Sequence, residues 1–320
     1  MGEMVDGVWQ AKGRTARHRE GRFQRAETQF RERVSADGSS GFKAEAGRYH
    51  LYVAHACPWA HRTMIFRALK GLEAAISVSF VEPLMLDQGW ELSEGADPVN
   101  GARAMHQVYA KARPGYSGRC SVPVLWDKAT GTIVNNESAE IIRMLNAAFG
   151  ALGAKGPDYY PEGLRQAIDA VNAEVYDNVN NGVYKCGFAA SQTAYEEAFG
   201  ALFATLERLE GLLARQRYLV GERLSEADWR LFTTLVRFDA VYFGHFKCNL
   251  RRLVDYPNLW GHTRELFQEP GVAGTVDLPK IKEHYYGSHR QLNPTGIVPL
   301  GPELDFALPH DRGRLPAAAA

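Results

Sequence analysis

Cysteine is scarce in this sequence: the 320 residues include four, at positions 57, 120, 186 and 248. Each lies more than sixty residues from the next, so the close pairs of a zinc knuckle, a zinc ribbon or a two-cysteine redox loop are missing. A chain of this length also needs no disulfide framework to fold. We therefore expect four free thiols in a reducing compartment, and no metal site.

Net charge is lacking too, because 37 basic residues balance 37 acidic ones. This balance argues against nucleic acid as the main partner, since nucleic-acid-binding domains carry a basic excess. The sequence contains no run of about eighteen apolar residues, which is the length that a membrane-spanning helix needs. The opening MGEMVDGVWQ has no apolar stretch of a secretory signal, and Asp6 stands where myristoylation needs Ser or Thr. These absences predict a cytoplasmic protein that acts on a small molecule, without a membrane partner.

The length favours two domains over one, because single hydrophobic cores rarely grow beyond roughly 250 to 300 residues. Composition suggests four segments. A polar arm, irregular or disordered, precedes an α/β domain, and a Gly- and Pro-rich linker then leads into helical sequence and an extended tail. The predicted segments are 1–46 for the arm, 47–150 for the first domain, 162–293 for the second domain and 294–320 for the tail.

The first domain begins with a strand, a turn and a helix. RYHLYVAHA at 48–56 alternates and is rich in aromatic and β-branched residues, and apolar residues recur at helical spacing after Pro58. A second strand at 75–83 implies a parallel pair with a right-handed crossover. After a long insertion at 84–118, two short strands form a hairpin at 120–138 and a helix follows. This order is thioredoxin-like, provided that the insertion contains little more than a helix.

The second domain shows apolar spacing of three and four over 162–182, 192–215 and 225–240, with no convincing strand before position 250. We expect it to be all-helical. Ser225 with Asp228 three residues later predicts a capping box at the start of one helix.

Cys57 is the strongest chemical signal. A thiol at a helix N-terminus, followed by proline at the first helical position, sees unpaired N–H groups that favour the thiolate and lower its pKa. Ala60 stands where a two-cysteine redox motif has its resolving cysteine, so an outside thiol would have to release a mixed disulfide. A buried structural cysteine is the alternative. The strand, Cys, Pro, helix context favours a reactive thiol.

Glu137, Ser138 and Pro123 each have a structural and a functional interpretation. Ser138 as N-cap, with Glu137 supporting the first turn, explains the pair fully, although a helix start could also hold a ligand carboxylate. Pro123 would spoil a central strand, and therefore marks an edge, a bulge or a cis bond. A cis bond would leave the backbone of Val122 available to a peptide ligand.

Four segments together resemble the glutathionyl-hydroquinone reductases, the Xi class of the glutathione transferase superfamily. They are CPWAHR at 57–62, RCSVPVLW at 119–126, IVNNESAEII at 133–142 and NGVYKCGF at 181–188. The resemblance covers nearly the whole chain. It implies the glutathione transferase architecture, a thioredoxin-like N-terminal domain and an all-α C-terminal domain, and it implies a homodimer.

The resemblance also implies residue roles. Cys57 would be the nucleophile, and glutathione, the co-substrate, would contact Trp90, Arg119, Val122, Glu137 and Ser138. Tyr184, Tyr242 and Tyr285 would line an aromatic pocket, with Tyr286, next to Tyr285, as the alternative to it. Our hypothesis is that Tyr184 is the main acid/base group and that the other two bind the quinol oxygens. Each tyrosine could instead be a packed core residue with its hydroxyl satisfied.

The implied reaction is the glutathione-dependent reduction of a glutathionylated hydroquinone, through a mixed disulfide between Cys57 and glutathione. Two other functions stay open. An omega-like thiol transferase or dehydroascorbate reductase would share the thiol and the glutathione site but need no quinol pocket. A non-catalytic, transferase-like scaffold would keep the fold and would not need Cys57.

Overall fold

The computed structural model describes residues 2–11 and 18–318, which divide into two compact units. Unit 1 joins residues 26–156 with 2–11 and with 279–288, and unit 2 joins 157–278 with 18–25 and 289–318. A short segment from near the C-terminus therefore belongs to unit 1, and a short segment from near the N-terminus belongs to unit 2.

Unit 1 is built on a four-stranded sheet in the order β12, β11, β7, β8. Its strands are β7 (Tyr49–Val53), β8 (Ile76–Phe80), β11 (Val124–Asp127) and β12 (Thr132–Asn135). β7 runs parallel to β8, as the crossover predicts, whereas β11 pairs antiparallel with both β7 and β12. All five residues of β7 are buried, as expected of a central strand covered on both faces.

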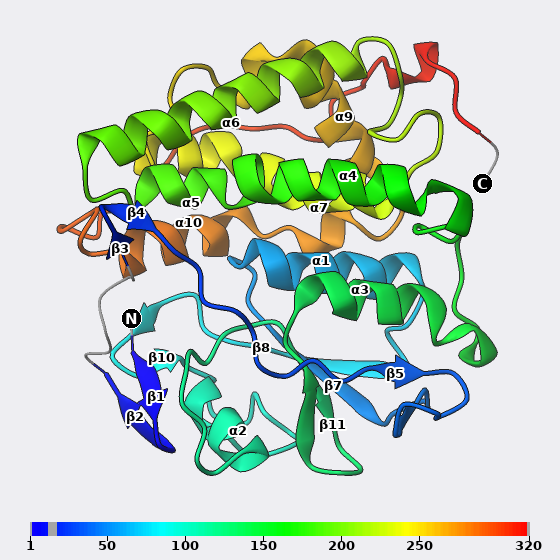
Figure 1. Cartoon of the computed structure of the whole chain (residues 1–320), viewed down its shortest axis with the longest axis vertical. Coiled ribbons are helices and arrows are strands. Elements are labelled where there is room, and N and C mark those ends of the chain that lie inside the picture. The colour runs from blue at the N-terminus through cyan, green and yellow to red at the C-terminus, as the bar shows by residue number, and fades with distance from the viewer. Residues whose placement is uncertain (1, 12–17, 319–320) are drawn as a thin grey trace. The chain divides into compact units, whose positions relative to one another are not determined.

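Helices cover both faces of this sheet (Figure 1). α1 (Pro58–Leu69) and α3 (Ser138–Ala147) lie side by side on one face, and α2 (Met105–Ala112) lies on the other. The long insertion thus contains one helix and a minimal hairpin of β9 (Met85–Leu86) and β10 (Gly89–Trp90). The thioredoxin-like prediction is confirmed. α10 (Leu278–Ser288) contributes its last ten residues to the same unit.

The N-terminal arm is less irregular than the sequence suggests. β1 (Glu3–Val5) and β2 (Val8–Gln10) form a hairpin, and β5 (Val34–Ser35) pairs in parallel with β6 (Phe42–Lys43). β3 (His18–Arg19) and β4 (Arg22–Phe23) form another short hairpin, which belongs to unit 2. Residues 12–17 of the arm lie outside the described residues.

Helices make up the ordered elements of unit 2 from residue 162 onwards, which confirms an all-α second domain. The main ones are α4 (Arg165–Val175), α5 (Gly182–Gly187), α6 (Gln192–Leu213), α7 (Glu226–Leu235), α8 (Phe243–His245) and α9 (Pro257–Gln268). Single π-turns, η3 (Tyr176–Asn180) and η4 (Phe238–Tyr242), precede α5 and α8. The capping box at α7 forms as predicted, with the Ser225 N–H donating to Asp228 Oδ2 at 3.0 Å.

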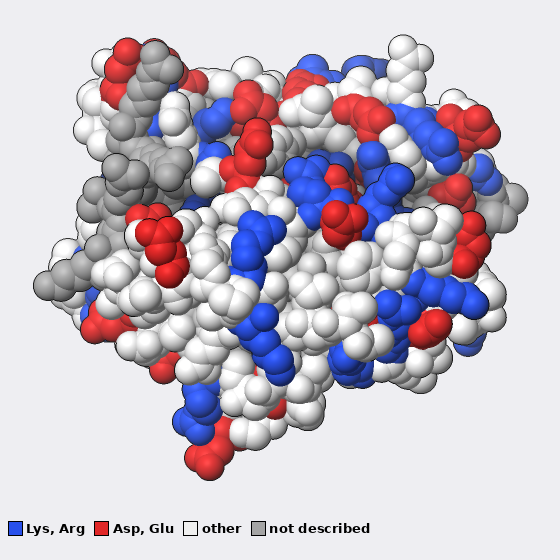
Figure 2. Space-filling model, turned by 60° about the horizontal axis from the view of Figure 1, so that its bottom comes forward, with Lys and Arg blue, Asp and Glu red and all other residues white. Residues whose placement is uncertain are grey.

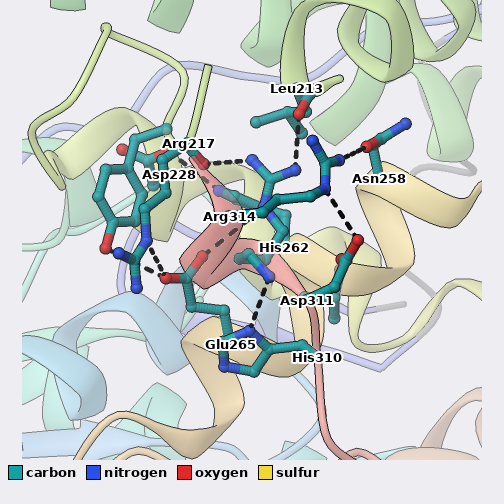
Figure 3. Close-up of polar contacts among 12 residues, drawn as sticks. Leu213, Arg217, Asp228, Asn258, His262, Glu265, His310, Asp311 and Arg314 are labelled. Atoms are coloured by element: carbon teal, nitrogen blue, oxygen red, sulfur yellow. Dashed lines mark hydrogen bonds and ion pairs between the residues drawn. The ribbon is translucent and has the colours of Figure 1, made fainter. Parts of the chain in front are cut away.

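The C-terminal segment of unit 2 is held by one buried arginine. Arg312 is fully buried and donates through Nη1 to the carbonyl of Leu213, at 2.6 Å, and through Nη2 to the carbonyls of Gln216 and Arg217. Leu213 is the last residue of α6, where carbonyls lack intrahelical partners. Arg312 therefore caps the end of α6. Figure 3 shows the polar contacts in this region, which include the Arg217–Glu265 and His262–Asp228 pairs.

Basic and acidic side chains are interspersed over the face of the molecule that Figure 2 shows. This arrangement matches the balanced composition of the chain. Among the described residues, no helix is long and apolar enough to cross a lipid bilayer.

Replacing Arg312 by Met should lower the free energy of unfolding by roughly 3 kcal/mol, because the carbonyls of Leu213, Gln216 and Arg217 lose this donor and the buried ion pair with Glu265 is broken. Urea denaturation followed by circular dichroism measures the change. Arg314→Met is the matched control, since Arg314 is 42 % exposed and its contacts, with Asp311, Asn258 and the carbonyl of Ala214, all lie at the surface. The control should cost less than about 1 kcal/mol. Equal losses in the two variants would show that the cap is not what holds the segment.

Candidate functional site

The sheet of unit 1 brings four connections to one edge. β7 ends where Val53 lies opposite Phe80, the last residue of the parallel strand β8. β11 runs the other way, so its first residue, Val124, lies opposite Tyr52 near the same end of β7. β12 in turn ends at Asn135, opposite Leu125. Four segments therefore meet the sheet at this edge. They carry Cys57, Trp90, Val122 and Glu137.

Cys57 is the N-cap of α1, as the sequence predicts, and Pro58 is the first helical residue. Its Sγ accepts the Ala60 N–H at 3.5 Å, and its thiol donates to the carbonyl of Val122 at 3.3 Å. The side chain is partly exposed. A sulfur in this position faces the unpaired amides of the first turn, which stabilise a thiolate over a thiol.

The peptide bond between Val122 and Pro123 is cis, one of the three possibilities that the sequence leaves open. The carbonyl of Val122 faces Cys57, and the residue itself is 5 % exposed. Arg119, three residues earlier, is partly exposed, and its carbonyl accepts the hydroxyl of Tyr116 at 2.9 Å.

The start of α3 differs from the prediction in one respect: Glu137, not Ser138, is the N-cap. Glu137 Oε1 accepts the Ala139 N–H at 3.1 Å, and Ser138 is the first helical residue, buried, with its hydroxyl 3.4 Å from Arg62 Nη1. A carboxylate can cap a helix as well as a hydroxyl can, and it also complements the helix dipole. The local rule favoured Ser138 because it did not include Arg62, which reaches Ser138 from α1.

Trp90 is held from the far end of the chain. Its ring stacks on His284 of α10, with centroids 4.7 Å apart and an interplanar angle of 19°. His284 Nδ1 lies 2.8 Å from the carbonyl of Pro83, to which it donates, and Ser288 Oγ accepts the Met85 N–H at 2.9 Å. α10 therefore fixes the segment that leads from β8 to Trp90.

Gly287 lets α10 lie close to Leu84. A Cβ at this position would lie 2.5 Å from Cδ2 of Leu84, so the end of the leucine side chain would have to move. Tyr285, beside His284 on α10, is 1 % exposed and lies in unit 1. Sequence reasoning singled out Tyr285 but missed His284, although both stand in KEHYY.

The other two tyrosines lie in unit 2, in a cluster of aromatic rings. The ring of Tyr184 lies 6.1 Å from that of Tyr242 and 5.3 Å from that of Phe246. Tyr242 is fully buried, whereas Tyr184 is partly exposed. Of the two rings, Tyr184 therefore offers more surface to a ligand. Arg25 also contacts this ring and was not identified from the sequence.

The remaining cysteines have different surroundings from Cys57. Burial raises the pKa of Cys120 to about 12, and it raises the pKa of Cys248 well above its usual range. Cys186 is buried beside Tyr184 on α5. Among residues 2–11 and 18–318, no group of three or more His, Cys, Asp or Glu side chains is arranged to hold a metal ion.

Comparison with protein families finds two matches. The model of the glutathione S-transferase N-terminal domain matches residues 56–148, and that of the glutathione S-transferase C-terminal domain matches residues 192–265. The first match includes Cys57 and both helix starts at the edge of the sheet.

Individual relatives are similar over almost the whole chain. The glutathionyl-hydroquinone reductase YqjG of Escherichia coli is 53 % identical over 98 % of both chains. The glutathionyl-hydroquinone reductase PcpF of Sphingobium chlorophenolicum is 54 % identical over 94 % of this chain and 96 % of its own. The glutathione-bound structure of YqjG superimposes with a TM-score of 0.89 at 52 % identity, covering 98 % of this chain and 99 % of that one. A Xi class transferase from Natrialba magadii gives 0.92 at 46 % identity, covering 99 % and 98 %.

Brief treatment with iodoacetamide at pH 7.5 should alkylate Cys57 at least about tenfold faster than Cys120, because the thiolate is the nucleophile and the pKa of Cys120 is raised to about 12. Both side chains are partly exposed, which makes Cys120 the matched control. Peptide mass spectrometry after a time course measures each rate. Faster labelling of Cys120 would contradict the assignment of Cys57 as the reactive thiol.

Proposed function

This chain belongs to the Xi class of the glutathione transferases, and from that premise we propose that it reduces glutathionyl-hydroquinones to hydroquinones with glutathione as the co-substrate. The observation that carries the proposal is the single thiol at the start of α1, with Ala60 in place of a resolving cysteine. Such a site can take glutathione onto Cys57 but depends on a second thiol to remove it.

The glutathione site in this proposal lies along the edge of the sheet. The backbone of Val122 and the side chain of Arg119 bind the peptide part, while Glu137 and Ser138 bind the γ-glutamyl end. The start of α3 supports this role, because the positive end of the helix dipole suits a ligand carboxylate and the carboxylate of Glu137 suits a ligand amine. Trp90 packs against the ligand, and its stack on His284 keeps the indole in one orientation.

The first half-reaction breaks a thioether. The Cys57 thiolate attacks the glutathione sulfur, a disulfide bond forms, and the carbon–sulfur bond breaks. If the ring is first converted to its keto tautomer, the released electron pair passes to the carbonyl oxygen, which becomes the phenolate of the hydroquinone. We assign the proton transfers of this tautomerisation to Tyr184, as acid/base group, and the binding of the quinol oxygens to Tyr242 and Tyr285.

The second half-reaction restores the enzyme. A second glutathione, as its thiolate, attacks the glutathione sulfur of the mixed disulfide, which releases glutathione disulfide and the Cys57 thiolate. Two glutathione moieties thus leave as disulfide for each hydroquinone formed, one from the substrate and one from solution. The absence of a resolving cysteine at position 60 agrees with this stoichiometry.

We further propose that the protein acts in the cytoplasm as a homodimer. All four cysteines are free thiols, which fits a compartment where glutathione keeps thiols reduced. The dimer is an expectation from the family and is testable by light scattering.

Incubation with glutathione and a glutathionylated hydroquinone should release free hydroquinone, measured by liquid chromatography. Cys57→Ser should reduce the rate to background, because a hydroxyl cannot form the mixed disulfide, and Cys120→Ser should keep a rate near that of the wild type. Turnover of dehydroascorbate without hydroquinone release would favour the omega-like alternative. Binding of glutathione without hydroquinone release and without dehydroascorbate turnover would favour the non-catalytic, transferase-like scaffold.

His284→Ala should raise the KM for glutathione roughly three- to tenfold with little change in kcat, because an aromatic stack is worth about 0.5 to 1.5 kcal/mol. His106→Ala is the matched control, since His106 makes a similar stack on Trp9, at 4.8 Å, elsewhere in unit 1. The steady-state KM should not change in the control. Equal KM values in the two variants would contradict the role given to His284.

A further inference from the structure

A guanidinium from the N-terminal segment covers one face of the Tyr184 ring. Arg25 Cζ lies 5.1 Å from the centroid of that ring and 5.7 Å from the centroid of Phe23. Arg25 Nε also donates to the side-chain oxygen of Asn181 at 3.0 Å. Asn181 precedes Tyr184 by three residues, about one helical turn, so one turn of helix fixes both the ring and the charge above it.

The segment that carries Arg25 is anchored independently of Tyr184. Arg22, in β4, donates through Nε and Nη2 to the two carboxylate oxygens of Glu197, both at 2.9 Å. The carbonyl of Gly21 accepts the Ala190 N–H at 2.9 Å. Phe23 stacks on Phe188 with centroids 5.6 Å apart. All these residues belong to unit 2, so the placement of Arg25 over Tyr184 is a property of this unit alone.

The rings packed around Tyr184 lower the local dielectric constant, which strengthens the effect of a charge there, while Tyr184 and Arg25 are both partly exposed and therefore within reach of a ligand from solvent. The hydrogen bond to Asn181 orients the guanidinium without neutralising it. A guanidinium also stays protonated at any working pH. The phenolate of a ligand bound beside Tyr184 would therefore meet a permanent positive charge.

The other ionisable groups near Tyr184 do not replace this charge. Lys185 is paired with Asp177 at 2.5 Å. His245 forms a buried hydrogen-bonded pair with His289, 3.2 Å apart, and burial lowers the pKa of His245 to about 4, so it is neutral near pH 7. Lys247 is a further cation in this part of unit 2; it is exposed, and its charge acts on His245 and Cys248. Tyr242, Cys186 and Cys248 carry no positive charge in either protonation state.

We propose that Arg25 makes the aromatic cluster at Tyr184 selective for the ionised form of an aromatic alcohol, and that it stabilises the phenolate which forms as the thioether breaks. The proposal rests on the function given above and narrows its substrate class to hydroxyarenes that ionise readily. It gives the N-terminal segment a direct part in substrate recognition. The guanidinium takes no part in bond making and transfers no proton.

Binding of 4-nitrophenol tests the selectivity, because the phenol and its phenolate differ in visible absorption. The wild-type full-length protein should bind the phenolate about tenfold more tightly than the phenol, since a nearby opposite charge shifts an ionisation by roughly one unit or more. Arg25→Gln should abolish this preference, and Arg25→Lys should retain part of it. Equal affinities of the wild type for phenol and phenolate, or an unchanged preference in Arg25→Gln, would overturn the proposal.

Arg22→Gln separates the charge of Arg25 from the docking of its segment. It removes the anchor to Glu197, while the Gly21 carbonyl and the Phe23 ring still hold the segment and the charge of Arg25 is unchanged. The proposal expects the phenolate preference to survive in this variant. The same loss in Arg22→Gln and Arg25→Gln would show that only the docked segment matters, and would overturn the proposal.

Catalysis provides a second readout. Arg25→Gln should lower kcat for hydroquinone release about tenfold with the KM for free glutathione unchanged, because the positive charge acts on the developing phenolate. An unchanged kcat would overturn the catalytic part. A wild-type protein that prefers the phenolate but releases no hydroquinone would refute the proposed function and leave the selectivity of Arg25 standing.

Discussion

The proposed chemistry depends on the position of one sulfur atom at the start of α1. Cys57 Sγ accepts the Ala60 N–H and its thiol faces the carbonyl of Val122, so the helix start and the segment before β11 define its surroundings together. Both follow from the sheet, because β7 and β11 run antiparallel and bring their connections to one edge. Ala60 leaves this thiol without an internal partner for a disulfide, which makes an outside thiol part of the reaction.

Two short segments distant in sequence complete the two units. In unit 1, α10 brings His284 from near the C-terminus to stack on Trp90, and Gly287 allows it to pack against Leu84. In unit 2, the hairpin of β3 and β4 brings Arg25 from the N-terminal arm to the ring of Tyr184. His284 orients Trp90, and Arg25 brings a positive charge to Tyr184. The sequence had already pointed to Trp90 and Tyr184 as candidate site residues.

Local patterns in the sequence were enough to predict the strand, turn and helix around Cys57, the hairpin that follows the insertion, and the capping box at Ser225. Each of these depends on neighbours within a few residues. The N-cap of α3 was assigned to Ser138 because the rule weighs only local partners, whereas Arg62 reaches that hydroxyl from another helix. His284 and Arg25 escaped notice for the same reason, since their contacts join residues far apart in the chain and no spacing rule predicts them.

In the proposed reaction, Cys57 takes glutathione from the substrate and keeps it until a second thiol arrives. A single-turnover experiment can detect this intermediate: excess enzyme is mixed with a glutathionylated hydroquinone in the absence of free glutathione, and intact and peptide masses are measured. We expect one glutathione on the peptide that contains Cys57, in equal amount to the hydroquinone released, and its loss when glutathione is added. Hydroquinone release without that adduct, or with the adduct on another cysteine, would contradict the proposed reaction.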